Sequence, residues 1–227
     1  MQIKYLLFDA DGTLFDYDRA EQQAFYNTMR AFGIEKDNHR LHAEYKEINY
    51  AIWKDFEVQK ITAKELRVER FRRFVERQKY NFDPREMSAR YISFLSEGIH
   101  LLHGAKRIID YLQNKYSISI ITNGLSDVQY ARIYASELKD SFEHIFISEE
   151  IGFPKPSVDI FEHVFNALGN PAKNEVMIIG DSWRSDIVGG RDYGIITCWY
   201  NQKQVSSNDT YTPNFEIQDL NELMSIL

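Results

Sequence analysis

The chain has 227 residues, of which 44% are hydrophobic and 27% are charged, and its formal net charge is −7. This balance is typical of a globular protein and argues against a disordered chain. The length fits one large α/β domain or a core with an inserted lobe, and the acidic charge disfavours a nucleic-acid partner.

The first predicted element is a short buried strand, Tyr5–Phe8, which ends at the turn Asp9-Ala10-Asp11-Gly12. From about residue 19 to residue 95 glycine and proline nearly vanish, and apolar residues recur at helical spacing. This texture predicts a bundle of about four helices, with joints near Gly33, Lys60 and Asn81.

Two of these helices have well-marked starts. Thr62 is followed by Glu65, which is the pattern of a capping box. Asp83 precedes Pro84 and Glu86, which places a cap, a first-turn proline and an acidic residue in order.

After Gly98 short β-rich runs alternate with helical segments. The predicted strands are Ser117–Ile121, His144–Ile147, Glu175–Ile179 and Ile195–Cys198. The helices between them are predicted near Ala105–Lys115, Asp127–Ser136, Val158–Leu168 and Ser185–Asp192, and Gln202–Pro213 is expected to be a loop before a final short strand and helix. This alternation predicts an α/β fold with a parallel sheet. The first strand belongs to that sheet, so residues 1–15 and 100–227 form a Rossmann-like core, and residues 16–99 form an inserted helical bundle.

Polar side chains follow four of the predicted strands. Asp9 to Thr13 follow the first strand, and Thr122-Asn123-Gly124 follow the second. Lys155 comes shortly after the third strand, and Gly180-Asp181 with Asp186 follow the fourth. Because parallel strands end at the same edge of a sheet, these groups are expected to converge in space.

The converging set has the chemistry of phosphoryl transfer. Several carboxylates in one place would repel one another unless a hard cation such as Mg²⁺, which prefers oxygen ligands, lies among them. A lysine, a hydroxyl and the backbone N–H groups of the turns can hold phosphate oxygens. A carboxylate can also serve as the nucleophile and form an acyl phosphate.

These motifs resemble those of the haloacid dehalogenase-like (HAD) hydrolase superfamily. The run from Asp9 to Asp16 looks like its first motif, and Thr122, Lys155 and Gly180-Asp181 with Asp186 match the other three in order. The resemblance covers the whole chain. It implies a Rossmann-like core and identifies the helical insertion as a mobile cap that closes over the substrate and excludes water.

The resemblance also implies a role for each matched residue. Asp9 is the nucleophile, and Asp11 protonates the leaving oxygen and then activates water. Thr122 and Lys155 bind the transferring phosphoryl group, with Asn123 and Gly124 beside them in the substrate site. The expected Mg²⁺ ligands are Asp9, Asp11 through its backbone carbonyl, and Asp181, and Asp186 is expected to support the metal site.

The cap narrows the expected substrate. The run Asn49-Tyr50-Ala51-Ile52-Trp53-Lys54 is similar to the cap of pyrimidine 5′-nucleotidases in this superfamily. This similarity implies a nucleoside monophosphate as substrate, with Trp53 as a contact for the base. One departure is His103, which stands before Gly104-Ala105 where family members often carry proline.

Several other functions share these motifs. A phosphatase for sugar phosphates or other small metabolites is the alternative with the same chemistry. A phosphomutase, a phosphonate hydrolase and a catalytically idle binding protein also remain open, whereas the presence of Asp11 disfavours a dehalogenase. The single cysteine, Cys198, excludes an intrachain disulfide and suits a reducing cytoplasm. No stretch is apolar and long enough to cross a membrane, so we expect a cytoplasmic protein without membrane contact.

Overall fold

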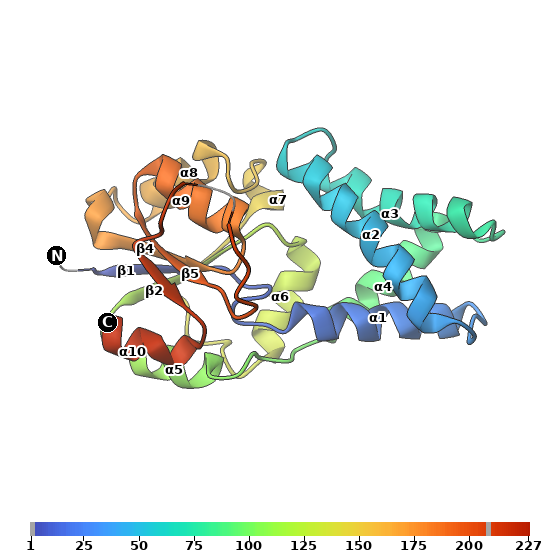
Figure 1. The fold of residues 1–227 in the computed structure, drawn as a ribbon, viewed down its shortest axis with the longest axis horizontal. Coiled ribbons are helices and arrows are strands. Elements are labelled where there is room, and N and C mark those ends of the chain that lie inside the picture. The colour runs from blue at the N-terminus through green and yellow to red at the C-terminus, as the bar shows by residue number, and fades with distance from the viewer. Residues whose placement is uncertain (1–2, 208–209) are drawn as a thin grey trace.

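The computed structural model describes residues 3–207 and 210–227, and a parallel sheet lies between helices in the left-hand part of Figure 1. In this part of the chain the sheet has six strands in the order β3-β2-β1-β4-β5-β6, and every neighbouring pair is parallel. The strands are β1 (Tyr5–Phe8), β2 (Ser117–Thr122), β3 (His144–Ile147), β4 (Val176–Gly180), β5 (Ile196–Tyr200) and β6 (Phe215–Ile217). The predicted α/β class with a parallel sheet is therefore confirmed.

Helices cover both faces of the sheet. Along β1, Leu6 and Phe8 point to one face and Leu7 to the other, as the alternation of side chains in a strand requires. The first face packs against α5 (Ala105–Leu112) and α10 (Leu223–Ile226), and the second against α8 (Val158–Ala167) and α9 (Gly189–Tyr193). Figure 1 shows these two pairs of helices on opposite sides of the strands.

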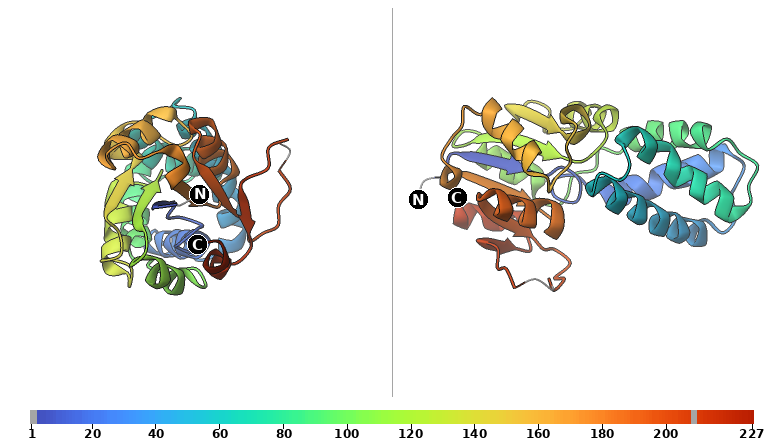
Figure 2. Two further views of the ribbon diagram at one scale, coloured as in Figure 1. Left: turned by 90° about the vertical axis from the view of Figure 1, so that its left-hand side faces the viewer. Right: turned by 90° about the horizontal axis from the view of Figure 1, so that it is seen from above.

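Four helices between β1 and β2 form a separate bundle beside the sheet (Figure 2). They are α1 (Tyr17–Ala31), α2 (Asn38–Glu57), α3 (Ala63–Gln78) and α4 (Pro84–Ser96), and we call this bundle the cap. Its interior is aromatic: Phe25, Tyr45, Phe71 and Phe74 are fully buried and contact one another. The division of the chain into 1–15 with 100–227 and 16–99 stays a prediction.

The predicted starts of two cap helices are confirmed. The Thr62 hydroxyl accepts a hydrogen bond from the Glu65 N–H, and the Glu65 carboxylate accepts one from the Thr62 N–H. The Asp83 side chain caps α4, with Pro84 in its first turn. The three predicted joints fall between successive helices of the cap.

The predicted helix Ser185–Asp192 differs from the observed structure. A π-helical segment, Trp183–Val188, comes first and α9 follows it. The wider π turn brings the Asp186 side chain back to the end of β4, where it accepts a hydrogen bond from the Ser182 N–H at 3.0 Å.

The remaining elements are α6 (Ser126–Ala135), α7 (Ser148–Ile151) and two 3₁₀ turns, Lys173–Glu175 and Leu220–Glu222. Within the described residues, the helices are too short or too polar to cross a membrane.

Candidate active site

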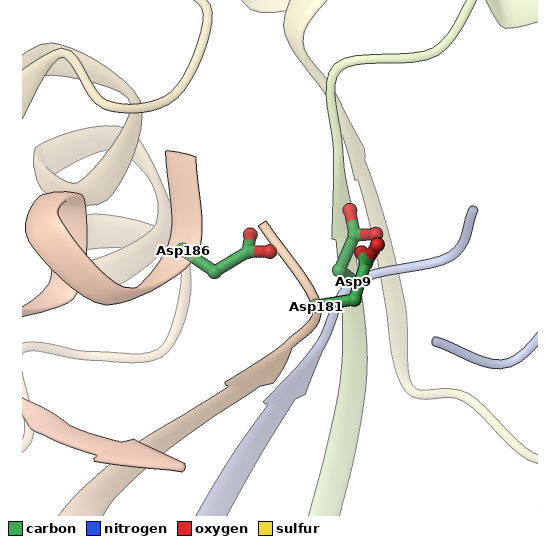
Figure 3. Close-up of side chains that lie close together, drawn as sticks. All are labelled: Asp9, Asp181 and Asp186. Atoms are coloured by element: carbon green, nitrogen blue, oxygen red, sulfur yellow. The ribbon is translucent and has the colours of Figure 1, made fainter. Parts of the chain in front are cut away.

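The site lies where three adjacent strands end. Asp9 follows β1 directly, Thr122 is the last residue of β2, and Asp181 follows β4. Because β1 lies between β2 and β4, Thr122 and Asp181 both lie beside Asp9, although each is more than a hundred residues from it in sequence. Figure 3 shows Asp9 and Asp181 together, with Asp186 directed toward them from the π-helical turn.

Lys155 connects this carboxylate group. Its side chain is buried, and its Nζ donates hydrogen bonds to Asp9 Oδ1 at 2.7 Å, to Asp186 Oδ1 at 2.6 Å and to the Ile121 carbonyl at 2.7 Å. Asn123 fixes the backbone of Lys155 by two hydrogen bonds, one from its amide to the Lys155 carbonyl and one from the Lys155 N–H. The lysine is therefore held in one place from both its backbone and its side chain.

Burial and charge shift the pKa values of these groups. Burial raises the pKa of Asp9 well above its usual range, and the nearby Lys155 only partly opposes this effect. Burial alone would lower the pKa of Lys155, but the charges of Asp186 and Asp9 outweigh burial and raise that pKa. Asp181 is exposed to solvent, but the protein atoms around its carboxyl group and the charge of Asp186 raise its pKa to about 7.

The three carboxylates form a group suited to a hard cation. One oxygen from each of Asp9, Asp181 and Asp186 lies within 4.8 Å of the other two. Lys155 supplies a single positive charge to this group, which leaves the carboxylates incompletely compensated. Both oxygens of Asp186 accept hydrogen bonds, from Lys155 and from the Ser182 N–H, so Asp9 and Asp181 are the better placed cation ligands. An all-oxygen donor set of this kind fits Mg²⁺.

Two glycines allow this close approach. Gly12 has a φ of +86°, and a Cβ at this position would lie 2.5 Å from Asp181 Oδ2. A Cβ at Gly180 would lie 2.2 Å from Asp186 Cγ. Asp181 is also bound by Thr13, whose hydroxyl accepts a hydrogen bond from the Asp181 N–H at 3.0 Å. Glycine is therefore required at position 12 of the first motif and at position 180 of the fourth, where Asp181 and Asp186 approach the backbone closely.

A cavity of about 320 Å³ lies between the strand ends and the cap. All nine residues predicted for the site line it: Asp9, Asp11, Trp53, Thr122, Asn123, Gly124, Lys155, Asp181 and Asp186. On the cap side, Tyr17 and Glu21 come from α1, and Lys46, Asn49 and Tyr50 come from α2. The cavity therefore joins a carboxylate-rich floor to a wall of aromatic and polar cap side chains, a size and lining that suit a small molecule.

Polar contacts from three cap helices join the cap to the rest of the chain. Arg67 of α3 binds Asp127 of α6 at 2.9 Å and Glu149 of α7 at 2.9 Å. At the end of α2, Glu57 accepts a hydrogen bond from the Ser185 hydroxyl at 3.1 Å. Asp18 of α1 binds Lys203, at 2.9 Å, from the loop after β5. Sequence reasoning did not identify these contacts, because partners so far apart in the chain carry no shared local pattern.

Sequence reasoning also missed two residues that bind Asp11. Gln129 Nε2 donates a hydrogen bond to Asp11 Oδ2 at 2.6 Å, and Arg132 Nη1 donates to Asp11 Oδ1. Both side chains are buried on α6. Their spacing of three residues on a helix that follows the second motif is the one signal that could have indicated them.

Comparison with known proteins agrees with this geometry. The family model for haloacid dehalogenase-like hydrolases matches residues 3–194. The HAD-hydrolase YfnB of Bacillus subtilis is 37% identical over 98% of this chain and 94% of its own length. A crystal structure of YfnB, described as bound to magnesium and revealing interdomain movement, superposes with a TM-score of 0.93 over 100% of this chain and 99% of that chain, at 36% identity.

Two further relatives are named as pyrimidine 5′-nucleotidases. YjjG of Escherichia coli is 32% identical over 100% of this chain and 99% of its own length. PynA of Streptococcus pneumoniae is 32% identical over 100% of this chain and 96% of its own length. The family match covers most of the chain, and these relatives span nearly all of it. The chain belongs to the haloacid dehalogenase-like hydrolases, and its relatives support a phosphatase.

Proposed function

We propose that this protein is a Mg²⁺-dependent phosphomonoesterase that works through an aspartyl-phosphate intermediate on Asp9 and acts on pyrimidine nucleoside 5′-monophosphates. The observation that carries the proposal is the buried Lys155, which binds Asp9 and Asp186 at the floor of the cavity. This arrangement places a carboxylate nucleophile beside a fixed cation, where the charge of a phosphoryl group needs compensation.

In the first step an Asp9 oxygen bonds to phosphorus while the bond between phosphorus and the leaving oxygen breaks. Asp11 gives its proton to that oxygen, and the dephosphorylated product departs. In the second step the ionised Asp11 takes a proton from water, and the water oxygen bonds to phosphorus while the bond to Asp9 breaks. Inorganic phosphate then leaves, and both carboxyl groups return to their starting forms.

The other residues of the floor bind and orient. Lys155 and the Thr122 hydroxyl are proposed to hold the transferring phosphoryl group, with the N–H groups of Asn123 and Gly124 nearby. Bound Mg²⁺ would be held by Asp9, Asp181 and the backbone carbonyl of Asp11, and it would offset the charge of the phosphate. Asp186 is proposed to support this arrangement through Lys155, to which it is hydrogen-bonded.

The nucleotide assignment is supported by the cap side of the cavity and by the names of two relatives. Trp53 and Asn49 both line the cap side of the cavity, so an aromatic ring and an amide lie across from the carboxylate-rich floor. A nucleobase offers a flat ring for stacking and polar edges for hydrogen bonds, which matches both groups. We further propose that residues 16–99 act as a cap that excludes water, and that the protein works in the cytoplasm as a catalyst for a small phosphorylated metabolite.

Phosphate release from an aryl phosphate, with and without Mg²⁺, tests the chemistry. We expect release that requires Mg²⁺ and is lost in Asp9→Asn. Asp110→Asn is the matched control, because Asp110 is an exposed carboxylate on α5 that pairs with Lys106. Full activity in Asp9→Asn would refute the covalent mechanism.

A further inference from the structure

Asp11 is held by two donors that belong to neither the motifs nor the cap. Both of its carboxylate oxygens are engaged, Oδ2 by Gln129 Nε2 at 2.6 Å and Oδ1 by Arg132 Nη1. The two donors lie one turn apart on α6, and both side chains are buried. Asp11 itself lines the cavity and its side chain is 22% exposed, so its carboxylate is held in one orientation at the edge of the substrate space.

Arg132 also contacts the two chain segments that connect the cap to the sheet. Its Nε donates a hydrogen bond to the Gly98 carbonyl at 2.8 Å, and Gly98 lies just after α4. Its guanidinium carbon lies 4.9 Å from the centroid of the Phe15 ring, just before α1. One buried side chain thus touches Asp11 and both connecting segments.

The two connecting segments are themselves joined. The Asp16 N–H donates to the His100 carbonyl at 2.9 Å, and the Leu102 N–H donates to the Leu14 carbonyl at 2.9 Å. The fit is tight at Gly98, where a Cβ would lie 2.5 Å from the Ala20 Cβ of α1. Arg132 therefore packs beside a closely fitted pair of backbone segments, and a shift of either segment would disturb its contacts.

Burial makes these contacts costly to lose. A buried guanidinium is tolerated when a carboxylate pairs with it. Nε and Nη1 of Arg132 are hydrogen-bonded, whereas Nη2 has no hydrogen-bond partner within the described residues. Among residues 3–207 and 210–227, Asp11 is the carboxylate that forms an ion pair with Arg132. The orientation of Asp11 and the placement of Arg132 are therefore coupled.

We propose that Arg132, assisted by Gln129, is a positioning residue for Asp11, and that it makes the placement of this carboxyl group depend on the two segments that carry the cap. This inference rests on the proposed function, in which Asp11 is the acid that protonates the leaving oxygen. It assigns a role in catalysis to α6, a helix outside the four motifs.

The test compares two phosphate esters that differ in their need for an acid. An aryl oxygen is weakly basic and leaves with little protonation, whereas the ribose oxygen of a nucleoside monophosphate needs the proton. Positioned acid–base catalysis contributes about 10²–10⁴-fold to a rate. In Arg132→Gln we expect kcat/KM for the nucleotide to fall at least about tenfold more than kcat/KM for the aryl phosphate. The loss should appear in kcat with little change in KM, and Arg132→Lys should restore part of it.

A merely structural role for Arg132 predicts a different pattern. It would lower activity toward both esters by the same factor, and that factor would follow the loss in melting temperature. The matched control is Tyr134→Ala, because Tyr134 is 58% exposed on the same helix, and this variant should behave like the parent. An equal loss for the two esters, or no loss in Arg132→Gln, overturns the inference.

If Arg132→Gln does not fold, Gln129→Leu tests the same inference. This variant removes one hydrogen-bond donor to Asp11 without leaving a buried charge. Its kcat/KM for the nucleotide should again fall more than its kcat/KM for the aryl phosphate, by a smaller factor than in Arg132→Gln. An equal loss of kcat/KM for the two esters in Gln129→Leu also overturns the inference. A folded parent that releases phosphate from neither ester overturns the proposed function as well, whereas an active parent with equal losses in the variants overturns the positioning role alone.

Discussion

Lys155→Met is the substitution whose effect can be worked out most fully from the structure. Methionine matches the length and buried surroundings of the lysine but removes three hydrogen bonds of 2.6–2.7 Å and the positive charge between Asp9 and Asp186. Removal of one partner of a buried ion pair costs about 3–5 kcal/mol, because a charge is left uncompensated. We expect a loss of that size in the free energy of unfolding at pH 8 without Mg²⁺.

The loss should shrink at acid pH. The pKa of Asp9 is already raised by burial, and removal of Lys155 would raise it further. A carboxyl group whose pKa is raised in the folded state binds more protons there than in the unfolded chain, so its stability contribution is lost as pH rises. The variant at pH 5 should therefore differ less from the parent than it does at pH 8.

Urea unfolding followed by circular dichroism measures these differences. The double variant Lys155→Met/Asp186→Asn lacks one of the two carboxylates that Lys155→Met leaves without a cation. It should therefore recover part of the free energy of unfolding that Lys155→Met loses. A loss below about 1 kcal/mol in Lys155→Met at pH 8 would refute the reasoning, because surface ion pairs contribute about that much. A double variant less stable than Lys155→Met would contradict the assignment of the cost to uncompensated carboxylates.

Three further outcomes are expected. Asp9→Asn should lower phosphate release at least about 10⁴-fold while its circular dichroism spectrum and melting temperature stay close to those of the parent. The metal-free protein should lose stability as pH rises from about 4 to 7, because the pKa of Asp181 is raised to about 7 and its folded-state proton is lost over that range. Mg²⁺ should therefore raise the melting temperature more at pH 8 than at pH 5, and an equal rise would contradict this account. Trp53→Ala should raise KM for a pyrimidine nucleotide about tenfold, as stacking of a base is worth about 1–3 kcal/mol, and leave KM for glycerol phosphate unchanged in the same phosphate-release assay.

Much of the fold could be predicted from local sequence patterns. The strand His144–Ile147 is predicted to the residue, because a short β-rich run stands between turn signals. The starts of α3 and α4 are predicted because capping uses side chains within one turn of each other. The convergence of polar residues follows from a general property of parallel sheets, and all nine predicted residues line one cavity.

Contacts between distant segments could not be predicted in this way. Arg132 lies between Ala131 and Ile133 in α6, and apart from its three-residue spacing from Gln129 the local sequence does not indicate that it is buried against Asp11. The predicted helix Ser185–Asp192 overlaps the π-helical segment Trp183–Val188, in which Asp186 is hydrogen-bonded to the distant Lys155, a contact that no local pattern indicates. Arg67 binds Asp127 and Glu149 across the boundary between the cap and the core, although no local sequence pattern links these residues. Each of these features depends on tertiary packing, which a single sequence shows only indirectly.

The most direct test of the proposed function is phosphate release from a panel of esters with Mg²⁺, in parent and Asp9→Asn. The panel should hold pyrimidine and purine nucleoside monophosphates, sugar phosphates and an aryl phosphate. We predict Mg²⁺-dependent release in the parent, with the highest kcat/KM for a pyrimidine nucleotide and none above background in Asp9→Asn. A preference for a sugar phosphate would overturn the nucleotidase assignment, and no release from any ester by folded, Mg²⁺-loaded protein would contradict phosphatase function itself.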